Sequence, residues 1–353
     1  MKVSHIITTI ERGGAENQLV ILCGEQVNIG NEVKVYFLKG APELLETLSD
    51  IGVVVNKLSG RNFIRQVLTF RRTIKQEKPD VIHAHLPRSE LLAVLSRTKV
   101  PIVISRHNAE PFYPRAPRSI SSLLSRYVCN RSEARIAISN SVSNFMHQNA
   151  EVAEDKHFTV IYYGYPFKSQ NILRKSTYNG KRKTFLTISR LVPQKDLSTL
   201  LRGIAVLKSK GLSFRSVVVG EGIENSQLKK LSANLDVSEC MEWTGRVQNT
   251  DDLYQAADLF ILSSKYEGFG LVLVEAMYWN LPIICANNQA ALEVLGNDYL
   301  GLFDVGNSEQ LATKVIWALT NTNILLQQLE KRKILFESGI MAKKIQQLYL
   351  NIT

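Results

Sequence analysis

Short apolar runs alternate with stretches of helical spacing along almost the whole chain, and this alternation restricts the fold more than any other feature. Residues 14–30 (GAENQLVILCGEQVNIG) have the spacing of a helix, and the strand-like run 32–38 (EVKVYFL) follows them. Strands that alternate with helices form parallel βαβ units. Several runs are apolar on both faces, as buried parallel strands are. The sequence therefore predicts an α/β protein built from doubly wound, Rossmann-like sheets.

One polar segment interrupts this alternation. Residues 164–183 (GYPFKSQNILRKSTYNGKRK) are basic and contain proline and glycine, which is typical of a linker, and the pattern restarts after them. A chain of 353 residues is also too long for one ordinary core. We therefore expect an N-terminal domain at 1–165, a linker at 166–183 and a C-terminal domain at 184–335. Ligands are expected in a cleft at the carboxyl ends of the strands.

Composition narrows the class of partner. The formal net charge of +11 favours anionic partners, but no nucleic-acid motif or stacking platform is found, so nucleic acid is not expected. The sequence has no signal-peptide pattern and no run as long as a membrane span, which favours a cytoplasmic protein. The cysteines lie far apart, which favours a reducing compartment and neither a disulfide nor a zinc site. They are Cys23, Cys129, Cys240 and Cys285.

Two glutamates frame a glycine turn in residues 267–277 (EGFGLVLVEAM). The turn precedes a predicted helix that begins near Leu271, and the first N–H groups of a helix have no intrahelical partners, so they can bind an anion. Glu267 precedes these donors, and Glu275 lies about one turn into the helix on roughly the same side as Leu271. Because carboxylates accept hydrogen bonds from vicinal hydroxyls, the stretch suits a ligand with both phosphates and sugar hydroxyls. The alternative is a helix-terminal acid and an unrelated surface acid.

A second candidate anion site is the strand-to-helix loop in residues 187–201 (TISRLVPQKDLSTLL). Arg190 and Lys195 lie in this loop, and Asp196 or Ser198 is expected to cap the following helix. A solvated basic loop is the alternative. The Gly-Glu-Gly turn at 220–222 would let a ligand approach the backbone, although many α/β turns need a glycine.

Five stretches, taken in order, resemble the retaining glycosyltransferases of family four. They are GGAE at 13–16, SRHN at 105–108, SRLVPQKD at 189–196, VGEG at 219–222 and EGFGLVLVEAM at 267–277. The resemblance implies the GT-B fold, in which two Rossmann-like domains face a central cleft. It also implies that residues 336–353 form a last helix that packs back on the N-terminal domain.

The resemblance implies a role for each matching residue. Arg190 and Lys195 would bind the diphosphate of a nucleotide sugar. Glu275 would hold the ribose hydroxyls, Glu267 would bind hydroxyls of the transferred sugar, and His107 would face that sugar from the N-terminal domain. The catalytic positions implied are His107, Glu267, Arg190 and Lys195. The other donor-binding positions implied are Gly13 and Gly14 in the first loop, Gly220 in the VGEG turn, Gly245 and Val247 near the base, and Phe269, Gly270 and Leu271 through their backbone N–H groups.

Two departures from the family pattern stand in the C-terminal half. Ser189 occupies a position that is commonly glycine in this family. The stretch NNQAALE at 287–293 replaces a Gly-Gly that often precedes a glutamate, which leaves a role of Glu293 in sugar recognition in doubt.

The sequence contains no Asp-x-Asp and no histidine cluster of convincing metal spacing, and the pair His83 and His85 is interpreted as structural. We therefore expect neither a metal nor another cofactor, because fixed cations and a helix start can neutralise a leaving diphosphate. The resemblance implies a UDP-sugar as donor, a hexose-type sugar as the transferred group, and a glycan or lipid-linked acceptor, as in bacterial polysaccharide or lipopolysaccharide assembly. Glu267 is the tempting carboxylate nucleophile, but the resemblance implies retention without a covalent intermediate on it.

Three alternatives stay open. A nucleotide-sugar epimerase or a phosphorylase would use the same two-domain fold, and a non-catalytic subunit would bind the nucleotide sugar or glycan without turnover. A dinucleotide oxidoreductase is less well supported, because no strand is followed by a full GxGxxG.

Two basic stretches of the N-terminal domain, 61–78 and 112–135, have two possible functions. They either bury their apolar side and expose a solvated basic face, or dock on an anionic membrane surface. The first stretch is predicted to be an amphipathic helix. The residues expected on its apolar side are Phe63, Ile64, Val67, Leu68 and Ile74.

Overall fold

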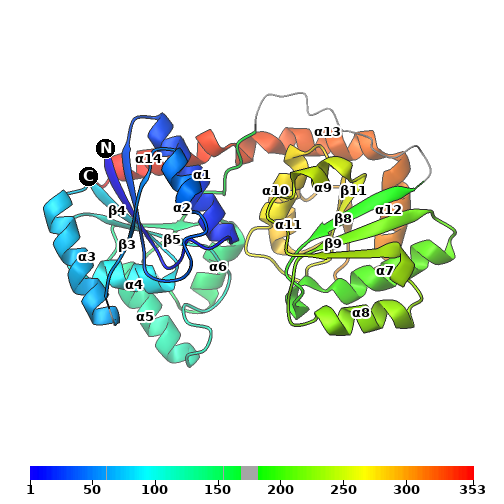
Figure 1. The fold of residues 1–353 in the computed structure, drawn as a ribbon, viewed down its shortest axis with the longest axis horizontal. Coiled ribbons are helices and arrows are strands. Elements are labelled where there is room, and N and C mark those ends of the chain that lie inside the picture. Colours follow the sequence, from blue (N-terminus) through cyan, green and yellow to red (C-terminus); the bar gives the residue numbers. More distant parts are fainter. Residues whose placement is uncertain (61, 154, 168–181) are drawn as a thin grey trace. The chain divides into compact units, whose positions relative to one another are not determined.

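The computed structural model consists of two compact units, which are described separately (Figure 1). Unit 1 comprises Met1–Pro166 together with Leu335–Thr353, and unit 2 comprises Phe167–Ile334. Each unit holds a parallel sheet covered by helices, so the predicted α/β fold with two doubly wound, Rossmann-like domains is confirmed. The residues that the structure describes are 1–60, 62–153, 155–167 and 182–353. Most of the predicted linker lies outside them.

The sheet of unit 1 has 7 parallel strands in the order β3-β2-β1-β4-β5-β6-β7 within the described residues. The order reverses at β1, so the carboxyl ends of β1 and β4 form the switch point at which doubly wound sheets bind ligands. The strands are β1 (Lys2–Ile7), β2 (Glu32–Phe37), β3 (Val54–Lys57), β4 (Val81–His85), β5 (Ile102–Arg106), β6 (Ala134–Ala137) and β7 (Thr159–Val160).

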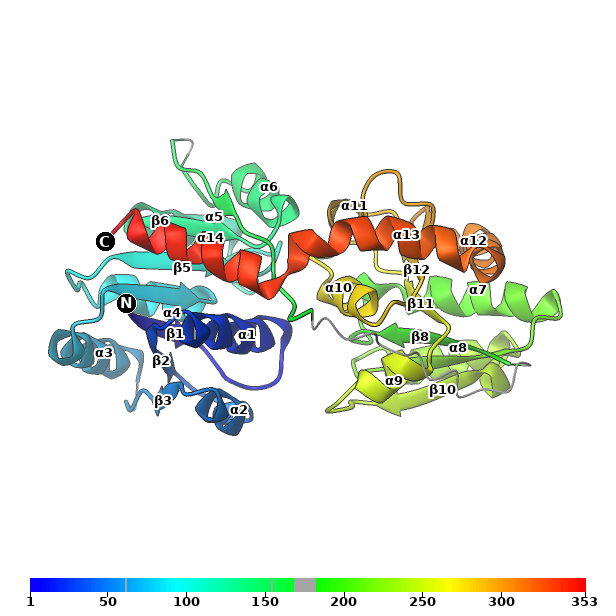
Figure 2. The same cartoon turned by 90° about the horizontal axis from the view of Figure 1, so that it is seen from above.

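Helices cover both faces of this sheet. The helices α1 and α14 lie side by side on one face, and α4 and α5 lie on the other (Figures 1 and 2). The α14 side chains Met341, Ile345 and Tyr349 are buried against strand residues such as Val3 and Val81. The helices of unit 1 are α1 (Gly14–Asn28), α2 (Leu45–Asp50), α3 (Phe63–Glu77), α4 (Pro87–Leu95), α5 (Arg118–Asn130), α6 (Asn140–Gln148) and α14 (Ser338–Leu350).

The start of α14 is joined to the end of the first segment of unit 1. The Tyr165 N–H donates to the Phe336 carbonyl at 2.7 Å, and the Ser338 N–H donates to the Tyr165 carbonyl at 3.0 Å. The two backbones approach so closely that a Cβ on Gly164 would lie 2.5 Å from the Ser338 Cα, so only glycine fits there. Residues 336–353 therefore lie with the N-terminal domain.

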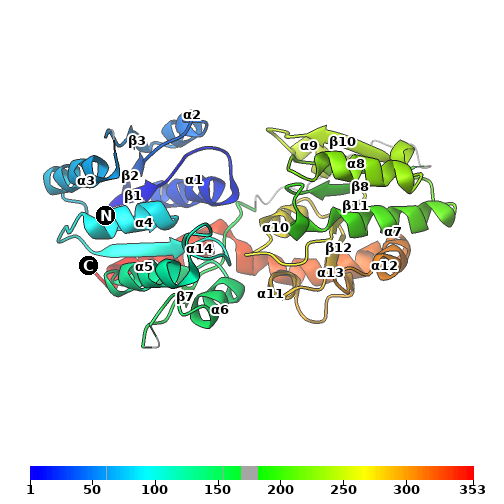
Figure 3. The ribbon, with the colours of Figure 1, turned by 90° about the horizontal axis from the view of Figure 1, so that it is seen from below.

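Unit 2 has a parallel sheet in the order β10-β9-β8-β11-β12-β13. Helices α7 and α12 pack together, and α10 and α11 pack against α13 (Figure 3). The strands are β8 (Lys183–Ile188), β9 (Phe214–Val219), β10 (Met241–Gly245), β11 (Leu259–Leu262), β12 (Ile283–Ala286) and β13 (Leu302–Phe303). The helices are α7 (Leu197–Ser209), α8 (Asn225–Asn234), α9 (Asp251–Ala256), α10 (Leu271–Tyr278), α11 (Gln289–Leu295), α12 (Ser308–Thr320) and α13 (Thr322–Lys333).

The packing of α3 differs from the prediction. Its buried side chains are Gln66, Phe70 and Ile74, whereas Ile64 and Leu68 are 69% and 49% exposed. The predicted apolar side was therefore wrong for these two residues. The cause is Gln66, whose amide donates at 2.9 Å to a backbone carbonyl just after β2 and so occupies the buried side. Neither α3 nor any other described helix is long and apolar enough to cross a bilayer.

Candidate functional site

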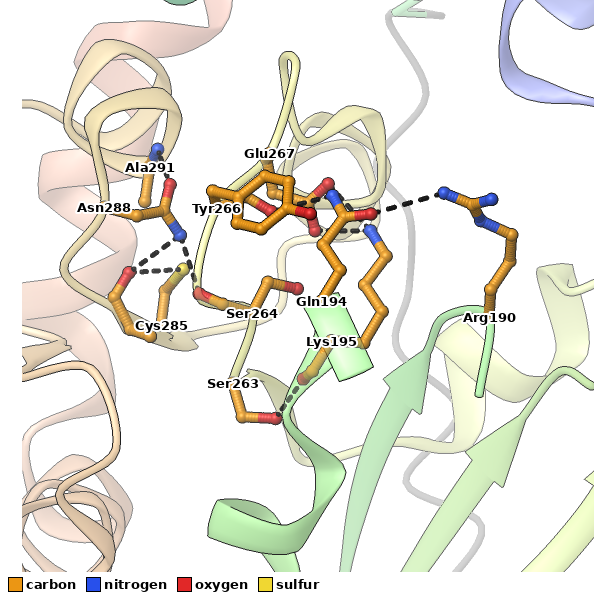
Figure 4. Close-up of polar contacts among 11 residues, drawn as sticks. Arg190, Gln194, Lys195, Ser263, Ser264, Tyr266, Glu267, Cys285, Asn288 and Ala291 are labelled. Atoms are coloured by element: carbon orange, nitrogen blue, oxygen red, sulfur yellow. Dashed lines mark hydrogen bonds and ion pairs between the residues drawn. The ribbon is translucent and has the colours of Figure 1, made fainter. Parts of the chain in front are cut away.

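Lys195 and Glu267 form the centre of the candidate site in unit 2. They follow β8 and β11, which are neighbouring parallel strands, so their loops leave the same edge of the sheet. The Lys195 Nζ lies 2.5 Å from one Glu267 carboxylate oxygen and 2.7 Å from the other (Figure 4). The two side chains are only 13% and 8% exposed. The ion pair is thus largely shielded from water, which strengthens its electrostatic attraction.

Hydrogen bonds hold the two loops together around this pair (Figure 4). The Gln194 side-chain amide donates to the Tyr266 carbonyl at 2.9 Å, and the Lys265 N–H donates back to the Gln194 carbonyl at 2.9 Å. The Ser263 hydroxyl donates to the Lys195 carbonyl at 2.9 Å. These bonds hold the backbones that carry Lys195 and Glu267 next to each other.

Arg190 adds a second cation at the end of β8. Its side chain is exposed, and one guanidinium nitrogen donates to the Gln194 side-chain oxygen at 3.4 Å (Figure 4). An exposed guanidinium offers further N–H donors in a planar fork that matches phosphate oxygens. Gln194 therefore connects Arg190 to the Tyr266 carbonyl of the loop that carries Glu267, and the Arg190 side chain stays open to an anion.

The loop between these cations and α7 differs in detail from the expected cap. Asp196 occupies the N-cap position with φ 47°, but its carboxylate accepts hydrogen bonds from the side chains of Ser198 and Thr199, both at 2.8 Å, rather than from a backbone N–H. The predicted side-chain cap of α7 is wrong for this reason. Asp196 instead stabilises the turn that follows Lys195.

Helix α10 begins directly after the loop that carries Glu267. Gly270 is its N-cap residue, with φ 87°, a left-handed conformation that favours glycine. No side chain caps this helix. The Leu273 N–H donates to the Gly270 carbonyl at 2.8 Å, so the two N–H groups before it, those of Leu271 and Val272, are the ones that can bind an anion together with the helix dipole. Phe269 is buried and anchors the turn.

Glu275 lies one turn into α10 and contacts α9 rather than the ion pair. Its carboxylate accepts a hydrogen bond from the Tyr254 hydroxyl at 2.8 Å. Burial raises the pKa of Glu275, and the Tyr254 hydrogen bond acts against this increase. The two glutamates of the EGFGLVLVEAM stretch therefore have different environments, one paired with a cation and one with a neutral donor.

A pocket of about 520 Å³ lies where β8, β9 and β10 end. Gly220 and Gly245 line it, together with Leu191, Glu221 and Thr244. Gly220 has φ 132°, and a Cβ on it would lie 2.0 Å from the Ser189 carbonyl oxygen. This glycine is therefore required for packing against the neighbouring loop, whether or not a ligand approaches. Val247 follows the loop out of β10 and is partly buried.

Ser264 and Asn288 explain one departure from the family pattern. The Asn288 side chain caps α11 by accepting from the Ala291 N–H at 3.0 Å, and its amide donates to the Ser264 carbonyl at 3.0 Å (Figure 4). The asparagine thus ties α11 to the end of β11. Glu293 lies on α11, and its carbonyl accepts a hydrogen bond from Arg332.

The unit 1 positions lie at the carboxyl edge of its sheet. Gly13 is the N-cap residue of α1, Gly14 is its first residue, and a Cβ on Gly13 would lie 2.4 Å from a Glu16 carboxylate oxygen. His107 follows β5, and both its ring nitrogens have partners: His85 at 3.2 Å and the Tyr163 hydroxyl at 2.5 Å. Burial, and next the charge of Arg106, lower the pKa of His107 to about 3. The ring is therefore neutral at physiological pH.

Comparison with known proteins agrees with this geometry. The family model "Glycosyltransferase Family 4" matches residues 12–167, and "Glycosyl transferases group 1" matches residues 168–335. The chain belongs to glycosyltransferase family four. It is 23% identical to a GalNAc-alpha-(1->4)-GalNAc-alpha-(1->3)-diNAcBac-PP-undecaprenol alpha-1,4-N-acetyl-D-galactosaminyltransferase of Campylobacter jejuni, over 88% of this chain and 86% of that protein.

Two further matches support the assignment. This family-four glycosyltransferase is 27% identical to a phosphatidyl-myo-inositol mannosyltransferase of Propionibacterium freudenreichii, over 87% of this chain and 83% of the relative. The crystal structure of Anabaena Alr3699/HepE in complex with UDP and glucose aligns with a TM-score of 0.81 at 20% identity, covering 99% of this chain and 100% of that one. The second match shows the GT-B fold.

The structure of this family-four glycosyltransferase joins some of the expected positions directly. Lys195 and Glu267 contact each other directly, and Arg190 contacts Gln194, whose amide donates to the Tyr266 carbonyl. Glu275 is linked to Tyr254 instead. Sequence reasoning assigned no role to Gln194 or Tyr254. Gln194 lies inside the SRLVPQKD stretch, so its position was a usable signal, but nothing in the local sequence around Tyr254 indicates its contact with Glu275.

Proposed function

We propose that this glycosyltransferase moves a hexose-type sugar from a UDP-sugar to a glycan or lipid-linked acceptor with retention of anomeric configuration. It needs no metal and no other cofactor in this proposal. The observation that carries the proposal is the shielded Lys195–Glu267 ion pair beside the uncapped start of α10. In this arrangement Lys195 and the start of α10 would bind negative charge, and Glu267 would bind hydroxyls.

The cations neutralise the negative charge of the leaving diphosphate in this proposal. The Lys195 ammonium has three protons and directs two of them at the Glu267 carboxylate, so one remains for a phosphate oxygen. Arg190 adds the fork of its guanidinium, the start of α10 adds the Leu271 N–H group, and the turn before it adds those of Phe269 and Gly270. Fixed donors of this kind stabilise developing charge without a bound metal ion.

The remaining positions hold the neutral parts of the donor. Glu267 accepts hydrogen bonds from hydroxyls of the transferred sugar, and Glu275 accepts those of the ribose. Gly220, Gly245 and Val247 lie around the base, in and beside the 520 Å³ pocket. The family resemblance adds Gly13, Gly14 and His107 of unit 1 as further proposed donor-binding positions.

Retention follows from the position of the leaving group. The bond between the sugar C1 and the diphosphate oxygen breaks, the acceptor oxygen bonds to C1 on the same face, and its proton passes to the leaving phosphate oxygen. Glu267 is a poor nucleophile here, because Lys195 binds both of its carboxylate oxygens. No covalent glycosyl-enzyme intermediate is expected, and mass spectrometry of the enzyme trapped during turnover tests this.

Relatives support the donor and acceptor classes. The names of both relatives described above specify acceptors with a lipid part, undecaprenol diphosphate in one and phosphatidylinositol in the other. The aligned Anabaena structure holds UDP and glucose. We further propose that the reaction takes place on the cytoplasmic face of a membrane.

A panel of nucleotide sugars tests the proposal. Each UDP- and GDP-sugar is screened by its effect on Tm, and the best stabiliser is then tested for transfer to lipid-linked and soluble glycan acceptors, with and without EDTA. We expect a UDP-hexose to stabilise the protein, EDTA to have no effect, and NMR to show the same anomeric configuration in donor and product. Donor isomerisation without acceptor would favour an epimerase, and binding without turnover would favour a non-catalytic subunit.

Contact with an anionic membrane is proposed for the exposed sides of α3 and α5 of unit 1. Besides Ile64 and Leu68 on α3, Ile120 and Leu123 on α5 are 50% and 68% exposed. The same two helices carry exposed arginines: Arg65, Arg71, Arg72, Arg118 and Arg126. Apolar side chains surrounded by cations fit an anionic lipid surface.

Flotation with vesicles of anionic lipid tests this contact. The double variant Leu68→Ser/Leu123→Ser should lose vesicle binding at low salt, whereas Ile324→Ser, which removes a 42% exposed side chain of unit 2, should not. Failure of the unmodified protein to float with anionic vesicles would exclude the proposal.

A further inference from the structure

Four histidines form a buried, hydrogen-bonded chain in unit 1. His5 on β1 is in register with His83 on β4, and His85 on β4 is in register with Ser105 on β5. These side chains therefore point to one face of the sheet, which α1 and α14 cover (Figure 2). His107, two residues after Ser105, continues the same row.

The first half of this hydrogen-bonded chain connects His107 to the buried core of unit 1. The His107 Nδ1 lies 2.5 Å from the Tyr163 hydroxyl, and its Nε2 lies 3.2 Å from the His85 Nδ1. The His85 Nε2 then lies 2.9 Å from the His5 Nδ1. Both ring nitrogens of His107 and both ring nitrogens of His85 therefore have partners.

The second half returns through α1 and α14 to β5. The His5 Nε2 lies 2.7 Å from the Gln26 side-chain oxygen, and the Gln26 amide nitrogen donates to the Tyr349 hydroxyl at 3.3 Å. The Tyr349 hydroxyl lies 2.6 Å from the His83 Nδ1, and the His83 Nε2 lies 2.7 Å from the Ser105 hydroxyl. The chain thus runs from Tyr163 to Ser105.

Gln26 gives this chain a direction. A neutral imidazole has one donor and one acceptor nitrogen, and the Gln26 oxygen accepts, so the His5 Nε2 carries the proton. The His5 Nδ1 then accepts from the His85 Nε2, and the His85 Nδ1 accepts from the His107 Nε2. Tyr163 donates to the remaining His107 nitrogen. All these bonds are satisfied by one set of tautomers, which is assigned from the hydrogen-bond network.

We propose that Gln26, acting through His5 and His85, holds His107 in the Nε2–H tautomer, and that His85 and Tyr163 are positioning residues for His107. This rests on the proposed place of His107 in the donor site. Both nitrogens are used inside unit 1, so His107 neither gives nor takes a proton during transfer. It serves as a neutral group of fixed orientation.

Burial keeps the imidazoles neutral. It lowers the pKa of His5 to about 4, and it lowers the pKa values of His83 and His85 well below their usual range. A neutral chain is required for the direction to pass from Gln26 to His107, because a protonated imidazole would donate from both nitrogens.

A transition metal is the competing occupant. One ligand nitrogen from each of His5, His83 and His85 lies within 4.8 Å of the others, close enough to surround an ion. Binding would break bonds of the chain, since each of these rings already uses both nitrogens. The full set of protein partners therefore favours the metal-free chain.

The matched variants Gln26→Leu and Gln26→Glu test the proposal. Histidine tautomers are read from ¹⁵N chemical shifts and long-range couplings at pH 7, with circular dichroism and Tm as checks of folding. In the unmodified protein we expect His5, His85 and His107 as Nε2–H tautomers. Gln26→Leu removes the acceptor, and His107, three hydrogen bonds away, should become a mixture of tautomers. Gln26→Glu keeps an acceptor oxygen and should restore the Nε2–H form.

Kinetics separates positioning from a purely structural role. Because misplacement of a site group affects chemistry more than binding, kcat should fall about tenfold in Gln26→Leu while the donor KM stays within about twofold, and Gln26→Glu should recover most of the rate. Tyr163→Phe, which removes the other partner of His107, should lower kcat in the same way.

Three results would overturn the proposal: an unchanged His107 tautomer in folded Gln26→Leu, a tautomer change without any change in kcat, or stoichiometric zinc in the purified protein. Absence of transfer by the unmodified protein would instead overturn the proposed function, and the tautomers would still decide whether the chain has the direction inferred.

Discussion

The carboxyl edges of the two sheets differ in the charge of the side chains that they carry. In unit 2 the edge carries formal charges, with Lys195 paired to Glu267 and the exposed Arg190 beside them. In unit 1 the corresponding edge carries neutral imidazoles that satisfy one another, ending at His107. Unit 2 thus has a charged edge, and the row of imidazoles forms the neutral edge of unit 1, which also holds a buried ion pair between Arg106 at the end of β5 and Glu90 on α4.

The distribution of residue types follows this division. All six histidines of the chain lie in unit 1, and four of them belong to the buried chain. The three tryptophans all lie in unit 2: Trp243, Trp279 and Trp317. The comparison shows that a shared fold determines where a site lies. The side chains in and after each strand determine whether that site contains charged or neutral groups.

Removal of Lys195 should have the largest effect, because it breaks the charged edge. Lys195→Ala leaves the shielded Glu267 carboxylate without its cation and removes a donor for the leaving phosphate. We expect transfer to fall roughly 10²- to 10³-fold, measured as initial rates at saturating donor. Lys265→Ala, which removes an exposed lysine of the adjacent loop, should retain nearly full activity. Comparable loss in both variants would contradict a special role of the pair.

Lower pH should decrease the stability of unit 1, which holds the neutral edge, more than the stability of unit 2. Imidazoles whose folded pKa is depressed take up protons below about pH 6.5 only in the unfolded chain, so the free energy of unfolding decreases as pH falls. The window runs from about 6.5 down to the folded pKa values, about 4 for His5 and about 3 for His107. Between pH 7 and 5 the loss is on the order of 1–2 kcal/mol per buried histidine.

Carboxyl groups of unit 1 oppose this trend in part. Burial raises the pKa of Glu90 to about 7 despite the nearby Arg106, and it also raises the pKa values of Glu16 and Glu151. Raised carboxyl pKa values mean that the folded form takes up protons first, which stabilises it on acidification. The four imidazoles outnumber these carboxyl groups, so the free energy of unfolding of unit 1 should still decrease between pH 7 and 5.

Separate probes can read the two units in one sample. Tryptophan fluorescence reports on unit 2, and hydrogen exchange of peptides from β1, β4 and β5 reports on unit 1. We expect exchange in these peptides to rise between pH 7 and 5, after correction for intrinsic rates, while the fluorescence transition hardly moves. His147→Gln, which removes an exposed histidine, should not change the result. Equal loss in both units would show that the histidine chain is not the cause.

The fold was predictable because its signal is local. Alternating strand and helix runs defined the α/β class and both sheets, since each run carries its own periodicity. The side of α3 that is buried was not predictable in the same way, because a glutamine that hydrogen-bonds to a backbone carbonyl occupies a core position. Periodicity counts apolar residues and cannot register such a polar contact.

The site was predictable as residues but not as contacts. Arg190, Lys195 and Glu267 were singled out from loops at strand ends, yet the ion pair joins residues separated by 72 positions and depends on β8 lying beside β11. His5 was missed altogether, because a single histidine in an apolar strand has no local pattern. Only the register of β1 with β4 brings it to His85.

Glu275 provides a smaller test within the charged unit, because its partner is neutral. If it holds the ribose hydroxyls, Glu275→Gln should weaken donor binding about tenfold, the scale of one lost charge-assisted hydrogen bond. Isothermal titration with the UDP-sugar and its 2′-deoxy analogue measures this. The unmodified protein should lose a similar factor with the deoxy donor, and the variant should lose little more. An equal further loss in the variant would place the carboxylate elsewhere.

The smallest effect is expected from Tyr254→Phe, which leaves the carboxylate of Glu275 in place and removes only its buried hydroxyl donor. Loss of one such bond is worth roughly 0.5–1.5 kcal/mol, so donor affinity should fall about threefold. If the hydroxyl acts on the donor through Glu275, the double variant with Glu275→Gln should bind no more weakly than Glu275→Gln alone. Independent, additive losses in this cycle would mean that Tyr254 contacts the donor itself, and the neutral donor in unit 2 would then be a binding group rather than a support for a charged one.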